Sequence, residues 1–229
     1  MCGRTAKWRT GWELIEAFGW GSVLPKLDDP PRYNVPPGTP QLMLHRMGGT
    51  PSADMVHWNY QPAWAAGKGR AYPNARVEKV VAGSGYYKVP WVKRQRGIMP
   101  VDGWYEWPAV DGKKQPYLIA GKDRAPLWLA TITLFQSGDA SNGPESGMAI
   151  ITADAVGGMI DVHDRRPIVL RTEDALAWVD PDVDTEFAAH LLLQLARPSD
   201  DFEWWKVSPA VGSVKNQGRE LMDPITTDG

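Results

Sequence analysis

The segment GIMPVDGWYEW at residues 97–107 is a short apolar run of the length and composition typical of β-strands. Similar runs lie on both sides of it: QLMLHR (41–46), DMVHWNY (54–60), QPYLIAG (115–121), PLWLATITLF (126–135), GMAIITADA (147–155), RPIVLR (166–171) and FEWWKVS (202–208). Their lengths and turn-rich separators are typical of antiparallel strands. We therefore predict an α+β fold, mainly antiparallel β-strands with a few peripheral helices.

Three helices are also indicated. Thr10 and Glu13 form a capping box, T-x-x-E, ahead of an apolar pattern, which predicts a helix near the N-terminus. Two further helices are expected near the C-terminus, one after a candidate cap at Thr172 and one after Asp184. Between the first helix and the strands, RYNVPPGTP (32–40) predicts a rigid extended or turn segment.

The composition is that of an ordinary globular protein, with 43% hydrophobic and 23% charged residues in 229. We expect one domain over residues 1–229, with 221–229 as a flexible tail. No apolar run has membrane-spanning length and the N-terminus has no signal-peptide core, so a cytoplasmic location is expected, nucleoid-associated in a bacterium. The single cysteine excludes an internal disulfide and a multi-cysteine zinc site, and we expect no metal or cofactor.

Charge is distributed unevenly along the chain. The net charge is −2, yet residues 65–96 contain eight Lys and Arg side chains against the single acid Glu78. Such a basic segment on an acidic body is typical of a phosphate-binding surface. The alternative is a solvated loop that happens to be rich in Lys and Arg.

Tryptophan is unusually abundant, with 12 residues against 4 phenylalanines. Five of them lie in or near the basic segment: Trp58, Trp64, Trp91, Trp104 and Trp107. Aromatic rings among cations favour single-stranded nucleic acid, whose bases stack on such rings. For most of these tryptophans a place in the core is the better interpretation.

Cys2 follows the initiator methionine, which aminopeptidases remove when the next residue is small. The product is a 1,2-aminothiol, with an amine of pKa about 8 beside a thiol of pKa about 8.5. Its amine condenses with an aldehyde to an imine, and its thiol then closes a thiazolidine ring. Neither a mid-chain cysteine nor an N-terminal serine gives this stable product. On position alone, a small residue buried in a strand is the better interpretation of Cys2.

Four other polar residues are candidates for chemistry. His163 lies among charged residues, and Glu106 lies among aromatic rings, where burial would raise its pKa toward neutrality; a surface-facing strand residue is the alternative. Asn74 and Arg76 offer an amide to orient a nucleophile and a guanidinium for phosphate. For the other three histidines we expect structural roles: His45, His57 and His190.

Together these residues resemble the SRAP (SOS-response-associated peptidase) family. The resemblance is carried in order by M-C-G-R (1–4), R-Y-N-V-P-P-G-T (32–39), W-x-x-x-P-x-W (58–64), N-A-R-x-E (74–78), D-G-W-Y-E-W (102–107), T-A-D-A (152–155), H-D-R-R-P (163–167) and V-K-N-Q-G (214–218). One departure is Asn59, where the family usually has glycine. Asparagine tolerates positive φ better than other residues, so the loop backbone is expected to survive.

The resemblance implies the SRAP-type fold and a lyase-like activity, the covalent capture of abasic sites in single-stranded DNA during the DNA damage response. Cys2 would supply the amine and thiol, Asn74 would position that amine, and Glu106 and His163 would act as the acid/base pair. Arg4 and Arg76 would bind phosphates, with Pro37, Trp64, Trp107 and Thr152 lining the DNA site. Glu78 is expected to pair with Arg4 or Arg76. We expect a monomer whose partner is abasic single-stranded DNA.

Two other functions are compatible with parts of this pattern. A cysteine peptidase would use Cys2 with a histidine, although only Met1 precedes it in this sequence. A non-covalent single-strand binder explains the basic segment and the tryptophans but leaves Cys2, Glu106 and His163 without a role.

Overall fold

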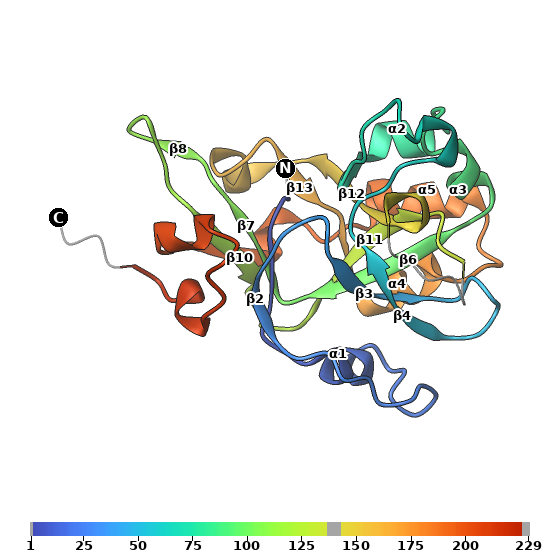
Figure 1. The fold of residues 1–229 in the computed structure, drawn as a ribbon, viewed down its shortest axis with the longest axis horizontal. Helices are drawn as coiled ribbons and strands as arrows, with labels where there is room; N and C mark the ends of the chain where they lie inside the picture. The colour runs from blue at the N-terminus through green and yellow to red at the C-terminus, as the bar shows by residue number, and fades with distance from the viewer. Residues whose placement is uncertain (1, 137–142, 226–229) are drawn as a thin grey trace.

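Two β-sheets form the centre of the structure, a computed structural model that describes residues 2–136 and 143–225 (Figure 1). The five-stranded sheet has the order β15 (Phe202–Lys206), β10 (Tyr117–Gly121), β7 (Gly103–Glu106), β1 (Thr5–Lys7) and β2 (Arg32–Val35). The eight-stranded sheet has the order β13 (Arg165–Pro167), β12 (Met148–Asp154), β11 (Leu127–Thr133), β6 (Arg96–Val101), β3 (Pro40–His45) and β4 (Ser52–His57), with β14 (Val169–Leu170) beside β11 and β5 (Asn74–Arg76) beside β12. A separate hairpin joins β8 (Ala109–Val110) to β9 (Lys113–Lys114).

Helices lie around these sheets (Figure 1). The α-helices are α1 (Gly11–Ala17), α2 (Val77–Val81), α3 (Lys88–Val92), α4 (Thr172–Trp178) and α5 (Thr185–Gln194). The 3₁₀ helices are η1 (Ala63–Ala65), η2 (Pro144–Ser146), η3 (Gly157–Asp161), η4 (Ser199–Asp201), η5 (Pro209–Gly212) and η6 (Arg219–Met222). In the described part of the chain every strand pair is antiparallel except β5 with β12, so the predicted α+β class is confirmed. No helix within the described ranges is long and apolar enough to span a bilayer.

Two of the three predicted helix caps are confirmed. Thr10 Oγ1 accepts the Glu13 N–H at 3.2 Å while Glu13 Oε2 accepts the Thr10 N–H at 2.7 Å, which completes the capping box. Asp184 caps α5 by accepting the Phe187 N–H at 2.8 Å. Thr172 was the wrong cap, because α4 begins at this residue and its hydroxyl accepts the indole N–H of Trp128 at 3.0 Å.

The segment 97–107 passes from one sheet to the other. Its first half lies in β6 and its second half in β7, with Asp102 at the corner. Asp102 Oδ2 accepts the backbone N–H groups of Trp8 and Arg9 at 2.7 and 2.9 Å, and Oδ1 accepts from the Arg9 guanidinium. At Gly103 an added Cβ would lie 2.7 Å from the Ile119 carbonyl oxygen, so the corner requires glycine there. These contacts fix the end of β1 against the crossover.

Apolar side chains fill the space between the sheets. One cluster combines Met43 and Met99 of the eight-stranded sheet with Trp104 and Ile119 of the five-stranded sheet, and it includes Cys2. A larger cluster lies between the eight-stranded sheet and the helices. Burial of this area supplies the main stabilisation of the fold.

The C-terminal segment is held by Asn34 of β2. The Asn34 side-chain amide donates to the carbonyl oxygens of Val211, Ser213 and Asn216 at 3.1, 2.9 and 2.9 Å. The predicted tail at 221–229 begins with packed residues, since Leu221 is buried and the Ile225 N–H donates to the Lys206 carbonyl at 3.0 Å. Residues 226–229 lie outside the described ranges.

Removal of the Asn34 amide should destabilise the protein. Asn34→Ala leaves the carbonyl groups of Ser213 and Asn216 without this donor and removes the Asn34 Oδ1 acceptor, so we expect a loss of about 3 kcal/mol in the free energy of unfolding, measured by urea denaturation. Lys215→Ala, in the exposed part of the same segment, is the control and should change it by less than about 0.5 kcal/mol. Equal stability of the two variants would contradict this assignment.

Candidate functional site

Cys2 is fully buried where the two sheets meet, immediately before β1. Its backbone carbonyl accepts a hydrogen bond of 2.8 Å from the side-chain amide of Asn74. Asn74 is the first residue of β5, which pairs in parallel with β12 at Ile150 and so has a fixed position. The other amide atom, Asn74 Oδ1, is buried and accepts no hydrogen bond among the described residues. An acceptor is therefore present beside the Cys2 backbone.

Glu106, the last residue of β7, lies close to Cys2. It is only 3% exposed, and burial raises its pKa from an ordinary value near 4.5 to about 7. Burial also raises the pKa of the Cys2 thiol, and the charge of Glu106 adds to that shift. The sequence-based prediction of a buried carboxyl group with a pKa near neutrality is confirmed.

His163 completes the cluster. Its Nε2 lies 4.0 Å from Glu106 Oε2, and its Nδ1 accepts the backbone N–H of Arg165 at 2.9 Å. Nε2 is thus the ring nitrogen that faces Glu106, while Nδ1 faces the Arg165 N–H and the Asp164 carboxylate. Burial lowers the pKa of His163, although the exposed carboxylate of Asp164, 2.6 Å from Nδ1, opposes that shift. A neutral imidazole thus stands beside the Glu106 carboxyl group.

Arg165, the first residue of β13 and the donor to His163 Nδ1, is held by several ion pairs and hydrogen bonds. Its guanidinium donates to both carboxylate oxygens of Glu78 at 2.9 and 3.2 Å, to Asp154 and to the Thr152 carbonyl oxygen at 2.7 Å. The prediction that Glu78 pairs with Arg4 or Arg76 is wrong, because Glu78 forms its ion pair with Arg165. The sequence gives no sign of this pairing, since the two residues are 87 positions apart.

Arg4 is half-buried and lies directly before β1, two residues after Cys2. Its guanidinium donates to Asn34 Oδ1 and, at 3.0 Å, to the Val211 carbonyl oxygen, and it lies 5.6 Å from the centre of the Trp107 ring. The structure therefore brings Arg4 and Trp107 together. Asn34, which the sequence analysis missed as a functional residue, holds both Arg4 and the C-terminal segment.

The remaining candidates differ in exposure. Trp64 and Arg76 are exposed and Pro37 is half-buried, so all three are accessible to a ligand. Thr152 differs from the expectation of a DNA contact: it is fully buried and its hydroxyl donates to the Ala75 carbonyl oxygen at 3.4 Å. Its hydroxyl supports β5 rather than facing solvent.

Trp64 is the only exposed residue among the twelve tryptophans, all of which lie in the described ranges. Six others are buried in the core, as predicted for most of them: Trp20, Trp58, Trp91, Trp104, Trp128 and Trp178. The exposed indole is therefore the tryptophan most available for contact with a ligand.

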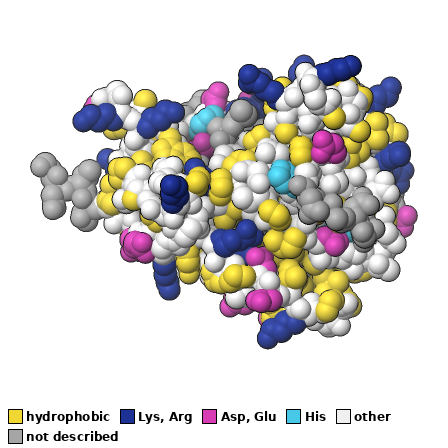
Figure 2. Space-filling view, in the orientation of Figure 1, with side chains coloured by type: hydrophobic (Ala, Val, Ile, Leu, Met, Phe, Trp, Pro, Cys, Tyr) yellow, Lys and Arg dark blue, Asp and Glu magenta, His cyan; other side chains and the backbone are white. Residues whose placement is uncertain are grey.

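The basic segment forms α2, α3 and the loops around them rather than one loop. Seven of its eight cations are exposed: Lys68, Arg70, Arg76, Lys79, Lys88, Lys93 and Arg94. Figure 2 shows Lys and Arg side chains gathered over this part of the molecule, at the upper right. Arg96 is the exception, because it is buried and donates to the carbonyl oxygens of Asp180 and Val183 at 3.0 and 2.6 Å.

Asn59 adopts negative φ, so the expected need for a residue that tolerates positive φ does not arise there. Positive φ occurs instead at Gly38, in the turn that contains Pro37. A Cβ added to Gly38 would lie 3.8 Å from Asn59 Nδ2, which places the Asn59 amide over this turn. The departure from the family pattern thus changes a surface beside Pro37 and leaves the backbone unstrained.

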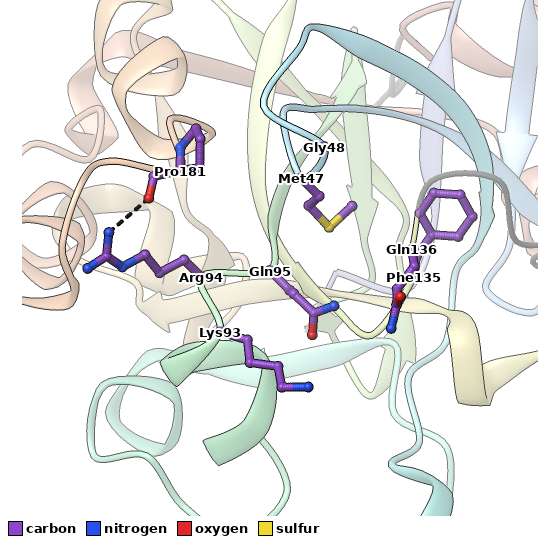
Figure 3. A pocket seen from close by; sticks show the side chains of 8 residues that line it. All are labelled: Met47, Gly48, Lys93, Arg94, Gln95, Phe135, Gln136 and Pro181. Carbon is purple, nitrogen blue, oxygen red and sulfur yellow. Dashed lines mark hydrogen bonds between the residues drawn. The ribbon is translucent and has the colours of Figure 1, made fainter.

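A separate pocket of about 530 Å³ contains none of the candidate residues (Figure 3). It is lined by Met47, Gly48, Lys93, Arg94, Gln95, Phe135, Gln136 and Pro181, and Arg94 donates to the Pro181 carbonyl oxygen across it at 2.9 Å. It offers no thiol, carboxylate or imidazole. Within the described ranges there is also no group of three His, Cys, Asp or Glu side chains suited to a metal ion.

Glu106 should make stability depend on pH. Its pKa is higher in the folded protein than in the unfolded chain, so the folded state binds more protons and its stability falls as pH rises from about 4.5 to 7. Glu106→Gln removes this dependence and should become more stable relative to wild type by about 2 to 3 kcal/mol between pH 5 and pH 8. Urea denaturation at the two pH values measures it, with the exposed Glu16→Gln as control. A constant difference between Glu106→Gln and wild type would contradict the raised pKa.

Comparison with known proteins gives concordant matches. The family model described as "SOS response associated peptidase (SRAP)" matches residues 1–214. The abasic site processing protein YedK of Escherichia coli is 37% identical over 98% of this chain and all of its own length. The abasic site processing protein HMCES of Mus musculus is 28% identical over 98% of this chain and 76% of its own.

A solved structure, that of a phage-related protein from Bordetella bronchiseptica, superposes with a TM-score of 0.78 at 36% identity. It covers 90% of this chain and 94% of its own. The motifs, the fold and these matches agree along nearly the whole sequence. The chain belongs to the SRAP family.

Proposed function

We propose that this protein captures abasic sites in single-stranded DNA through a covalent link to Cys2. The observation that carries the proposal is the convergence of Cys2, Asn74, Glu106 and His163 at one buried junction. The names of YedK and HMCES, both abasic site processing proteins, support the same substrate. Removal of Met1 is required, because only then does Cys2 have a primary amine.

The chemistry begins with the abasic sugar, which reacts in its ring-opened aldehyde form. Glu106 in its protonated form donates a proton to the ring oxygen as the ring opens, and the resulting carboxylate takes up the proton of the C1' hydroxyl, so the carboxyl group is protonated again. A pKa of about 7 makes the protonated form available at neutral pH. The Cys2 amine then attacks the aldehyde carbon to give a carbinolamine. Loss of water, assisted by a proton from the same carboxyl group, yields the imine.

The thiol completes the reaction. The S–H adds across the C=N bond, so that sulfur bonds to carbon and the proton passes to nitrogen, closing the five-membered thiazolidine. One water is lost overall. Since burial raises the pKa of the Cys2 thiol, sulfur remains protonated until the imine forms, and Glu106 and His163 are placed to move its proton.

DNA would follow the exposed cations and rings beside this junction. Arg76 is the last residue of β5, two residues after Asn74, and α2 begins directly after it. The exposed cations of α2 therefore follow the site closely along the chain. Pro37 and Trp64 are accessible to a strand, while Arg4 lies against Trp107. A single strand bends into such a site more readily than a duplex does, which favours single-stranded DNA as the substrate.

A peptidase reaction is the second candidate, because the family description names one. A cysteine nucleophile for amides needs a thiolate, which requires a lowered pKa. Here burial and Glu106 raise the pKa of the thiol instead. The lyase-like capture reaction, which starts from the amine, is the better match to this environment.

The free amine can be tested directly with the N-terminus. We expect denaturation-resistant adducts with an abasic oligonucleotide from the processed protein and none from Cys2→Ala. Cys2→Ser should give an adduct only when borohydride reduces the imine. An uncleavable N-terminal tag should abolish the adduct, because it converts the amine to an amide, whereas a tag after Gly229 should not. Denaturing electrophoresis and mass analysis measure all five proteins, and adduct formation by the N-terminally tagged protein at the untagged rate would exclude an aminothiol mechanism.

The acid/base pair should appear in the pH profile. Crosslinking requires an unprotonated amine, of pKa about 8, and a protonated Glu106, of pKa about 7, so the single-turnover rate should be bell-shaped with a maximum near pH 7.5. Glu106→Gln should lose the decline at high pH and react about 100-fold more slowly, and His163→Ala should slow by a similar factor. Affinity for intact single strands should change little. Wild-type rates from both variants would refute the assigned roles.

A further inference from the structure

A group of aromatic side chains lies outside the Cys2 cluster. Tyr86 contacts Trp64 and Tyr72 edge to face, with ring centres 5.2 and 5.4 Å apart. Trp64 is 63% exposed and Tyr72 is 42% exposed, which is unusual for rings of this size. We call these three residues the aromatic platform.

The platform is held in place by the loop that follows η1. Tyr86 Oη donates to the Arg70 carbonyl oxygen at 3.1 Å, and the buried Gln61 amide donates to the carbonyl oxygens of Ala65 and Gly69 at 2.9 and 3.0 Å. A Cβ added to Gly69 would lie 2.5 Å from Tyr86 Oη, so the loop approaches the ring closely. The exposed rings are therefore oriented before any ligand binds, which reduces the entropy lost on binding.

The platform adjoins the site. Tyr72 precedes Asn74 by two residues, a span of at most about 7 Å along the chain. Two contacts fix this span: Tyr72 and Tyr60 exchange backbone hydrogen bonds of 2.8 and 3.0 Å, and the Trp58 indole N–H donates to the Pro73 carbonyl oxygen at 3.0 Å. A strand whose abasic sugar lies at Asn74 would therefore have a neighbouring nucleotide close to Tyr72.

The charge around the platform favours nucleic acid over a peptide of mixed charge. Residues 62–76 contain Lys68, Arg70 and Arg76, all exposed, and no Asp or Glu. Exposed rings among cations without acids are suited to bases and phosphates, since every base has a face for stacking.

We infer that Tyr72, supported by Tyr86 and beside Trp64, stacks against the base of a nucleotide flanking the abasic site. This inference rests on the proposed function and adds a subsite to it. The site would then hold the strand on one side of the lesion by stacking, with no preference among bases, while Cys2 reacts with the sugar.

Equilibrium binding tests the subsite without the covalent step. The probe is a single-stranded oligonucleotide with a central tetrahydrofuran, an abasic analogue that has no aldehyde, and fluorescence anisotropy gives Kd. Tyr72→Ala should weaken binding about tenfold. Tyr72→Phe keeps the ring and should bind within about twofold of wild type, as should Phe187→Ala, which removes a ring of similar exposure, 46%, from α5.

Shortened probes locate the stacked base. When the nucleotides on one side of the tetrahydrofuran are removed, the difference between wild type and Tyr72→Ala should disappear, and removal from the other side should preserve it. 2-Aminopurine at the lost position should be quenched by wild type and not by Tyr72→Ala. Unchanged affinity of Tyr72→Ala, or an equal loss on every probe, would overturn the subsite. Crosslinking of a true abasic oligonucleotide by wild type is measured in parallel, so failure of the proposed function is seen separately.

Discussion

The passage of residues 97–107 through both sheets is the constraint on which the rest of the structure depends. β6 belongs to the eight-stranded sheet and β7 to the five-stranded one, so the two sheets cannot separate at this point. Asp102 fixes the corner by accepting hydrogen bonds from Trp8 and Arg9, which places β1 against β7. Cys2 precedes β1 and Glu106 ends β7. One crossover therefore brings the proposed nucleophile, Cys2, and the carboxyl group of Glu106 to the same junction.

The burial that stabilises this junction also shifts the pKa values of its two ionisable side chains, Cys2 and Glu106. Cys2 lies among Met99, Trp104 and other apolar side chains, whose removal from water is favourable. The same surroundings disfavour charge, which keeps the Cys2 thiol protonated and raises the pKa of Glu106 to about 7. A carboxyl group in this position costs stability above neutral pH. Such a cost is characteristic of residues retained for chemistry rather than for folding.

Local signals in the sequence were sufficient for much of the fold. The strands, the Thr10 capping box and the Asp184 cap depend on neighbouring residues, and each was predictable from them. α2 and α3 have five residues each, too few to show a helical period. Thr172 was misassigned because its hydroxyl accepts a hydrogen bond from Trp128, a partner distant in sequence.

The candidate site was likewise predictable where it depends on residue type and neighbours, and not where it depends on contacts between distant segments. Glu106 and His163 could be selected from their residue types and neighbours, and the structure places them 4.0 Å apart. The pairing of Arg165 with Glu78 joins segments far apart in sequence, which no spacing rule reveals.

Arg165 shows how the chemical and cationic parts of the site are joined. Its backbone N–H donates to Nδ1 of His163, which leaves Nε2 on the side of Glu106. Its guanidinium holds Glu78, the second residue of the helix that begins directly after Arg76. Because both contacts come from one residue of β13, the position of His163 beside Glu106 and the position of the exposed cations on α2 cannot vary independently. The ion pair with Glu78 also offsets the one acidic charge in the basic segment, beside the exposed cations Arg76 and Lys79.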